Sequence, residues 1–144
     1  ELKIKKCHPN AILPTYATDG SGCFDLYACI DGDPKRLNVG YFGKFATGLS
    51  VEIPDGYAMM IYSRSGHAFD YGVRLGNSVA VIDQDFRGQI MILLKNDGLD
   101  FMTIRHGDRI AQAMLIPVQR VSFIEVDELS ETVRGTGGMG STGA

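Results

Sequence analysis

The chain has 144 residues, a formal net charge of −3 and hydrophobic residues at 44% of its positions. This length suits one domain with a single core. The 14 lysines and arginines are dispersed along the chain, which excludes the basic patch expected of a protein that binds nucleic acid or an anionic membrane.

The first half of the chain alternates strand-sized segments with turns. Apolar residues and lysines alternate from Leu2 to Lys6, a pattern typical of a half-buried strand. Residues 24–28 alternate in the same way, and Asp25 stands on the face opposite Leu26. Taken alone, Asp25 reads as a solvent-exposed strand residue. Short β-rich runs follow through residues 36–51.

Residues 57–62 predict a strand that leads into the one helix we expect, about two turns from Ser65 to Tyr71. Ser65 is the expected N-cap. The start of a helix presents free backbone N–H groups and a positive dipole, and therefore offers a seat for an anion. Arg64 adds a fixed positive charge beside it.

Residues 77–94 predict the feature around which the rest of the chain is arranged. Two apolar, β-branched runs, residues 79–82 and 90–94, are separated by a polar connection that contains glycine. This pattern predicts a β-hairpin with a loop longer than two residues. Asp83, at the end of the first run, would be held by strand pairing and is suited to act as a general base. Aspartate also favours turns, so the alternative is that Asp83 and Asp85 serve only to form the turn.

The remaining segments predict strands over residues 101–105, 110–116 and 118–126, followed by a glycine-rich end. Residues 134–144 contain five of the 18 glycines and are expected to be mobile, because they cannot pack a core. Turns every ~8 to 12 residues predict an all-β sandwich or barrel, with a distorted jelly roll favoured. Folds of this kind are also common among plain binding modules.

The cysteines indicate a reducing environment. Cys7, Cys23 and Cys29 are odd in number and lack C-x-x-C spacing, which argues against a disulfide framework. We interpret them as small buried hydrophobic residues. No apolar run approaches the ~20 residues of a membrane span, and no signal segment is visible. We therefore expect a soluble, cytoplasmic protein with neither nucleic acid nor membrane as its partner.

Five segments, taken in order, resemble the motifs of the trimeric dUTP pyrophosphatases. They are Gly20–Ala28, Arg64–Ala68, Ala80–Gly88, Gly107–Gln112 and Arg134–Gly143. The resemblance implies a jelly-roll or barrel domain over residues 1–133, a homotrimer with active sites at the subunit boundaries, and a segment 134–144 that closes over an active site. It also implies hydrolysis of dUTP to dUMP and pyrophosphate with Mg²⁺, which keeps uracil out of DNA and supplies dUMP for thymidylate synthesis.

The resemblance assigns roles to individual residues. Asp83 would deprotonate the water that attacks the α-phosphorus and would meet the sugar 3'-hydroxyl. Asp25 would hold Mg²⁺ through water, since Mg²⁺ commonly keeps several waters and takes substrate phosphate oxygens. The residues expected to bind the phosphates and stabilise the developing charge are Arg64, Ser65, Gly66 and Gln112.

Uracil would be recognised by the predicted hairpin. Its pairing edge would meet the backbone near Val81, Ile82 and Met91 together with the Asn77 amide. Cytosine would set donor against donor at a cost of ~1 to 3 kcal/mol per mismatch. Further substrate contacts are expected from Ala80, Phe86, Arg134, Met139, Gly140 and Ser141.

Two of these positions depart from the pattern of the family. Phe86 stands where a tyrosine normally packs against the deoxyribose, so the ring face is kept and the hydroxyl is lost. Met139 stands where a phenylalanine normally stacks over the uracil. A thioether covers a base without aromatic geometry, which predicts looser closure.

Two rival functions remain. A dCTP deaminase shares the fold, but its chemistry uses a glutamate in the second strand of the hairpin, and residues 89–94 contain no carboxylate. A non-catalytic jelly-roll interaction protein would keep the fold alone. It would have no physical need for the complete set Asp25, Arg64, Ser65, Asp83 and Gln112.

Overall fold

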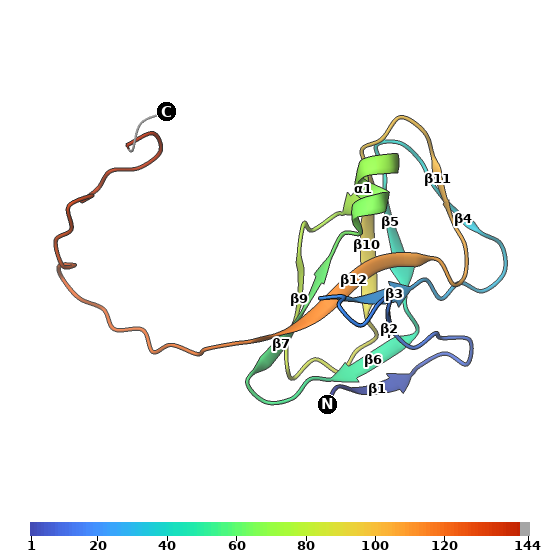
Figure 1. The fold of residues 1–144 in the computed structure, drawn as a ribbon, viewed down its shortest axis with the longest axis horizontal. Helices are drawn as coiled ribbons and strands as arrows, with labels where there is room; N and C mark the ends of the chain where they lie inside the picture. The colour runs from blue at the N-terminus through green and yellow to red at the C-terminus, as the bar shows by residue number, and fades with distance from the viewer. Residues whose placement is uncertain (142–144) are drawn as a thin grey trace.

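The structure is a computed structural model that describes residues 1–141. Strands dominate, and one short helix, α1, lies at one end of them (Figure 1). The all-β prediction is therefore confirmed. The strands form four separate antiparallel sheets that, over the residues described, do not close into a barrel.

The largest sheet has five strands in the order β2-β3-β12-β7-β9. These are β2 (Thr15–Tyr16), β3 (Phe24–Tyr27), β12 (Arg109–Pro117), β7 (Tyr57–Tyr62) and β9 (Ala80–Ile82). A three-stranded sheet has the order β5-β10-β8. Its strands are β5 (Phe42–Ala46), β10 (Met91–Asn96) and β8 (Val73–Leu75). The two smaller sheets pair β1 (Lys3–Lys6) with β6 (Leu49–Glu52), and β4 (Lys35–Leu37) with β11 (Met102–Ile104).

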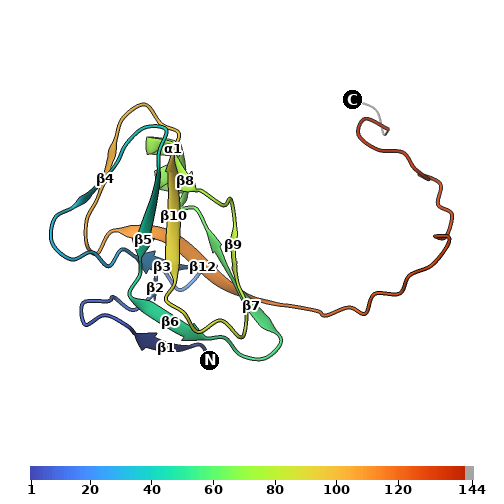
Figure 2. The same ribbon diagram turned by 180° about the vertical axis from the view of Figure 1, so that it is seen from behind.

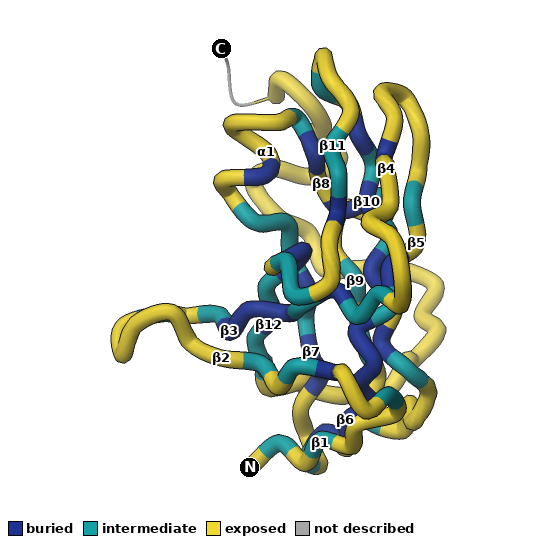
Figure 3. Tube along the Cα trace, turned by 90° about the vertical axis from the view of Figure 1, so that its right-hand side faces the viewer, coloured by how far each residue is buried: buried dark blue, intermediate teal, exposed yellow. Residues whose placement is uncertain are grey.

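The hydrophobic core combines side chains from the five-stranded and three-stranded sheets. Its members include Leu26, Met59, Ile61, Ile92 and Leu94, each at most 1% exposed. Buried stretches run along β3 and β12, whereas the loop between β2 and β3 is exposed (Figure 3). The period-two alternation along β7 thus turns one face to the core and leaves the other half-exposed.

The helix α1 (Ser65–Tyr71) forms over the predicted residues. The predicted N-cap is wrong by one residue, because Ser65 is the first helical residue and the extended Arg64, at φ −83° and ψ 134°, precedes it without a side-chain cap. At the other end Gly72 has φ 66° and donates its N–H to the Ala68 carbonyl. A Cβ at this position would lie 2.6 Å from Gly98 Cα, so this helix end requires glycine.

The predicted hairpin is wrong, although both of its apolar runs form strands. β9 pairs with β7, and β10 pairs with β5 and β8. Because both edges of β10 are occupied, none is left for β9. The connection between them carries Ile90, whose N–H donates to the Leu49 carbonyl and whose own carbonyl accepts from the Thr47 N–H.

The predicted strand over residues 118–126 is also wrong. The last ladder ends with β12 at Pro117, and Val118 then donates its N–H to the Gly56 carbonyl at 2.8 Å. From there to residue 141 the chain runs away from the body of strands as an extended segment that is exposed almost throughout (Figures 1 and 2). Its alternating apolar residues have no partner strand within the part of the chain described.

The interpretation of the cysteines as buried residues is wrong as well. Cys7 is exposed, Cys23 and Cys29 are partly exposed, and all three are free. The sequence patterns also missed the short strands β2 and β8, which are too brief to display a period. None of the helical residues in the range 1–141 forms a stretch long and apolar enough to cross a membrane.

Candidate active site

The site begins with a row of side chains across the five-stranded sheet. Gln112 on β12 is directly opposite Asp25 on β3 and Tyr62 on β7. Directly opposed residues point to the same face of a sheet, so the three side chains share one face. Asp25 is only 8% exposed. Its reading as a solvated strand residue is therefore wrong, because Arg64 and Arg109 lie against its carboxylate.

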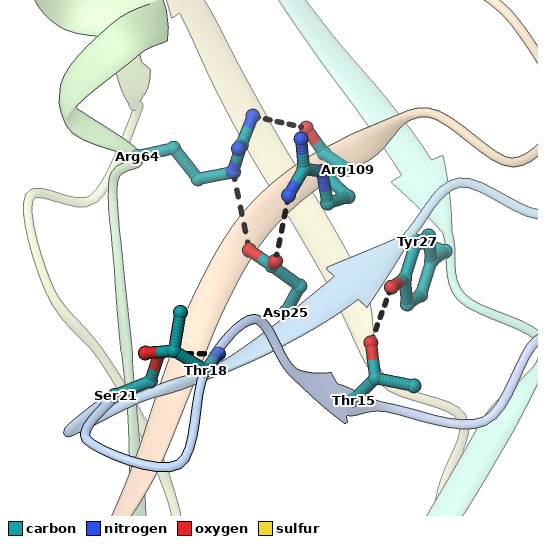
Figure 4. Close-up of polar contacts among 7 residues, drawn as sticks. All are labelled: Thr15, Thr18, Ser21, Asp25, Tyr27, Arg64 and Arg109. Carbon is teal, nitrogen blue, oxygen red and sulfur yellow. Dashed lines mark hydrogen bonds and ion pairs between the residues drawn. The ribbon is translucent and has the colours of Figure 1, made fainter.

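Two arginines hold the Asp25 carboxylate (Figure 4). Arg64 Nε donates to Asp25 Oδ1 at 3.2 Å, and Arg109 Nη1 donates to Asp25 Oδ2 at 3.3 Å. Arg64 Nη1 also donates to the Arg109 carbonyl at 3.2 Å. A buried carboxylate needs such partners, since an unpaired charge is costly to desolvate. The cluster fixes Arg64 at the junction of β7 and α1.

Arg109 is a site residue that sequence reasoning missed. It lies within the segment Gly107–Gln112, where only Gln112 was given a role. The available signal was its position at the start of the strand that carries Gln112. That signal identifies Arg109 only once the pairing of β12 with β3 is known.

The same end of the sheet holds the other predicted phosphate residues. Gln112 Nε2 donates to the Ser63 carbonyl at 3.0 Å, and the Ser63 hydroxyl accepts the Leu75 N–H at 2.9 Å. Ser65 and Gly66 are exposed at the start of α1. Asp25, Arg64, Ser65, Gly66 and Gln112 therefore lie together at this end of the sheet.

Asp83 lies elsewhere. It follows β9, in which Ile82 is opposite Met59 near the start of β7, whereas Arg64 follows the end of β7. At about 3.3 Å per strand residue, the two ends are on the order of 20 Å apart. Asp83 lines a separate cavity of about 420 Å³ together with Asp85 and Arg120. Within one chain, the predicted base and the predicted phosphate residues do not meet.

The residues predicted to surround the base and sugar are exposed, except Ala80 and Ile82, which are partly buried. Val81 is 55% exposed, Met91 47% and Phe86 40%. A Cβ at Gly88 would lie 2.6 Å from the Phe86 ring, so this ring is packed against its own loop. Val81 and Met91 belong to different sheets. The remaining predicted residues, Asn77, Ala80 and Ile82, lie in β9 or in the turn before it.

The predicted C-terminal residues lie in the extended segment. This segment runs away from the body that carries both the Asp25–Arg64 cluster and Asp83 (Figure 2). Arg134 Nε donates to the Gly137 carbonyl at 2.9 Å. Met139, Gly140 and Ser141 are exposed. Residues 142–144, which complete the predicted closing segment, lie outside the described residues.

A metal cage of protein ligands is absent from residues 1–141, where no three His, Cys, Asp or Glu side chains gather to hold an ion. A carboxylate has about four lone-pair positions, and the two arginines occupy one on each oxygen of Asp25. The rest leave room for hydrogen bonds from metal-bound water. The donor set therefore fits Mg²⁺ held mainly by phosphate and water, and does not fit a directly ligated ion.

Comparison with known proteins identifies the family. The dUTPase family model matches residues 9–143. The chain belongs to the dUTPase family. A deoxyuridine 5'-triphosphate nucleotidohydrolase from Bordetella avium is 44% identical over 144 residues, which cover 99% of this chain and 96% of the relative. One from Helicobacter pylori is 42% identical over 143 residues, which cover 99% and 97%.

Solved dUTPase structures have the same fold. The dUTPase of Staphylococcus bacteriophage 80alpha, determined with dUpNHpp, has a TM-score of 0.89 at 24% identity and covers 100% of this chain and 99% of its own. The dUTPase from phage phi11 of S. aureus has a TM-score of 0.81 at 20% identity, covering 92% and 99%. At such identities the likeness establishes the jelly-roll fold of the dUTPases for this chain.

Proposed function

We propose that this chain hydrolyses dUTP to dUMP and pyrophosphate, as a homotrimer whose active sites combine residues from different copies. The observation that carries the activity is membership of the dUTPase family. Relatives at 44% and 42% identity, matched over 96% and 97% of their length, are named for this reaction. The absence of a carboxylate from residues 89–94 disfavours a dCTP deaminase.

The trimer is supported by the division of the site. The Asp25–Arg64–Gln112 group, Asp83 and the C-terminal segment lie in three separate places on one chain. A rigid sheet does not bring the two ends of β7 together. A neighbouring copy, however, would place its Asp83 against this copy's Arg64, and a C-terminal segment would close over both. Shared sites of this kind need a closed assembly with repeated interfaces.

In the proposed reaction Asp83 accepts a proton from a water molecule as the water oxygen bonds to the α-phosphorus. The bond from the α-phosphorus to the bridging oxygen breaks, and that oxygen leaves with pyrophosphate. The Ser65 hydroxyl and the first amides of α1, which have no side-chain cap, would donate to the oxygens on which charge develops. Asp83 would also orient the sugar through its 3'-hydroxyl.

Arg64 would bind the phosphates without leaving Asp25. Its guanidinium has five N–H groups, of which one donates to Asp25 and another to the Arg109 carbonyl. The others remain for phosphate oxygens, and Gln112 and Gly66 would complete this part of the site. Asp25 would hold Mg²⁺ through water. When bound, the ion neutralises charge on the phosphates.

Selection of uracil would rest on Asn77 and on the backbone near Val81, Ile82 and Met91, with Ala80 beside them. The exposed ring of Phe86 would pack on the deoxyribose. We further propose that residues 134–144 form a mobile closing segment on a domain of residues 1–133. Arg134 would then exchange its contact with the Gly137 carbonyl for phosphate, while Met139, Gly140 and Ser141 would cover the nucleotide.

The test is pyrophosphate release from each deoxynucleoside triphosphate in the presence of Mg²⁺. We expect a response to dUTP alone. Ammonia release from dCTP would instead support the deaminase. If no triphosphate gives pyrophosphate and none binds, the chain is an interaction protein that keeps only the fold.

A further inference from the structure

A cavity of about 510 Å³ lies between α1 and the segment that runs from β11 into the start of β12. Arg64 and Arg109 form part of its wall and also hold Asp25. The cavity therefore adjoins the residues of the candidate active site that are predicted to bind the phosphates. It extends from there to side chains that have no role in the reaction described above, in particular Arg105 and His67.

The lining of this cavity is positively charged. It carries three guanidinium groups, from Arg64, Arg105 and Arg109, against a single lining carboxylate, Asp108. Asp25, beside the lining, pairs with Arg64 and Arg109, so that among the described residues Arg105 supplies the unpaired positive charge. Asp108 already accepts the backbone N–H of Arg105 at 2.7 Å. In the part of the chain that the structure describes, the Arg105 guanidinium makes no hydrogen bond or ion pair. Such a lining favours an anionic ligand, and phosphate matches the geometry of guanidinium groups.

His67 supplies a second, independent feature of the cavity. Its side chain contributes to the wall but is 9% exposed, and its Nδ1 has no hydrogen-bond partner among residues 1–141. The Tyr71 ring meets it edge-on with ring centroids 6.5 Å apart. A buried polar atom without a partner is costly, and within the described residues no hydrogen bond at Nδ1 holds His67 in place. In a cavity lined by cations, a bound anion stabilises the ring when it is protonated.

We propose that this cavity receives the distal end of the triphosphate, and pyrophosphate after cleavage, with Arg105 contacting phosphate oxygens and His67 gaining a proton as the anion binds. The identity of the natural ligand rests on the proposed dUTP hydrolysis. The affinity of the cavity for pyrophosphate does not, because it is measurable without turnover.

The charges around His67 determine whether the affinity for the anion rises or falls with pH. Burial and the positive charges of Arg64 and Arg109 lower its pKa, and Asp108 opposes them. Arg105 adds another positive charge on the same wall. A bound anion offsets these cations and raises the pKa again. Between the lowered and the raised pKa, binding takes up a proton, so affinity strengthens as the pH falls.

The role of Arg105 is tested by calorimetric binding of inorganic pyrophosphate and of dUMP to the whole protein. Arg105→Gln is expected to weaken pyrophosphate binding about tenfold and to leave dUMP binding unchanged, because dUMP lacks the distal phosphates. Lys44→Gln removes an equal charge from an exposed position on β5 and serves as the control. Equal pyrophosphate affinity in Arg105→Gln and Lys44→Gln overturns the proposal.

The role of His67 is tested by the pH dependence of the same binding between about pH 6 and 8. Pyrophosphate has its own protonation, which is common to all variants and cancels in their ratio to the parent. His67→Leu and His67→Gln should both lose the extra strengthening at low pH, and melting curves confirm that each is folded. A parental pH slope in a folded variant contradicts the linkage. Failure of dUTP hydrolysis with intact pyrophosphate binding would reject the proposed function alone.

Discussion

Asp83 and Asp85 are two carboxylates on the wall of one cavity, and only Asp83 directly follows a paired strand. Because Asp83 directly follows the paired Ile82, the ladder restricts its backbone, and this helps to aim the side chain as a general base requires. We predict that Asp83→Asn lowers kcat by ~10²–10⁴-fold while binding of dUpNHpp persists. Asp85→Asn keeps kcat near the parental value. Steady-state pyrophosphate release measures both, and similar rates for the two variants would exclude Asp83 as the base.

Replacing the single residue Asp25 tests how much its ion pairs contribute to the stability of the fold. Asp25→Asn leaves Arg64 and Arg109 facing each other without the charge that now separates them. Because the Arg109 side chain is 48% exposed, we expect a loss of about 2 kcal/mol in the free energy of unfolding, less than for a fully buried pair. The loss is measured by urea denaturation.

The matched control is Asp97→Asn, which breaks the exposed pair with Arg74 and a longer one with Lys95. That change is expected to cost about 0.5 kcal/mol or less. If the two substitutions cost the same, the Asp25 cluster contributes nothing beyond an ordinary surface pair.

At the scale of elements, the sequence patterns located strands and the helix well where the pattern is local. The strand Tyr57–Tyr62 and the helix Ser65–Tyr71 lie where periodicity and turn residues predicted them. Pairing is not local. The apolar runs on either side of Asp83 suggested a hairpin, but the choice of partner depends on which edges β5, β7 and β8 leave free.

The same limit explains which site residues were found. Asp25 and Gln112 were assigned from motifs, yet the burial of Asp25 and the role of Arg109 follow only from the register of β3 against β12. Local alternation shows which side chains share a face of one strand. It does not show which side chains from other elements cover that face, and this decides whether a carboxylate is solvated or paired with two arginines.

The C-terminal segment carries an element-scale prediction. Fixing the seven residues 134–140 costs ~7 to 14 kcal/mol of conformational entropy, and one charged contact returns ~1.5 to 3 kcal/mol. Arg134 alone therefore does not hold the segment closed, and several contacts are needed at once. Truncation after Arg134 should remove most turnover and leave the oligomer intact. Pyrophosphate release and light scattering measure these two properties, and parental turnover in the truncated chain would refute closure.

At the scale of the whole molecule, the decisive feature is the distance between the two ends of β7. Asp83 lies near one end, and Arg64 follows the other. Rearranging this within one chain would break the ladders that join β7 to β9 and β12. Association of copies requires no such rearrangement. The exposed segment after Pro117, with apolar residues that find no partner strand among residues 1–141, fits the same arrangement.

This arrangement predicts complementation between two inactive variants. Asp83→Asn and Arg64→Gln should each abolish most turnover alone. If every site takes Asp83 from one copy and Arg64 from another, co-expressed mixed trimers contain sites that draw both residues intact. Random 1:1 assembly then restores about one quarter of the sites over all trimers, because each of two independent positions is intact half of the time. Among mixed trimers alone, about one site in three is intact, because each ring contains one productive neighbouring pair. Differently tagged chains allow the mixed trimers to be isolated and their pyrophosphate release measured. A site contained within one chain would give no recovery, since every copy would carry one defect.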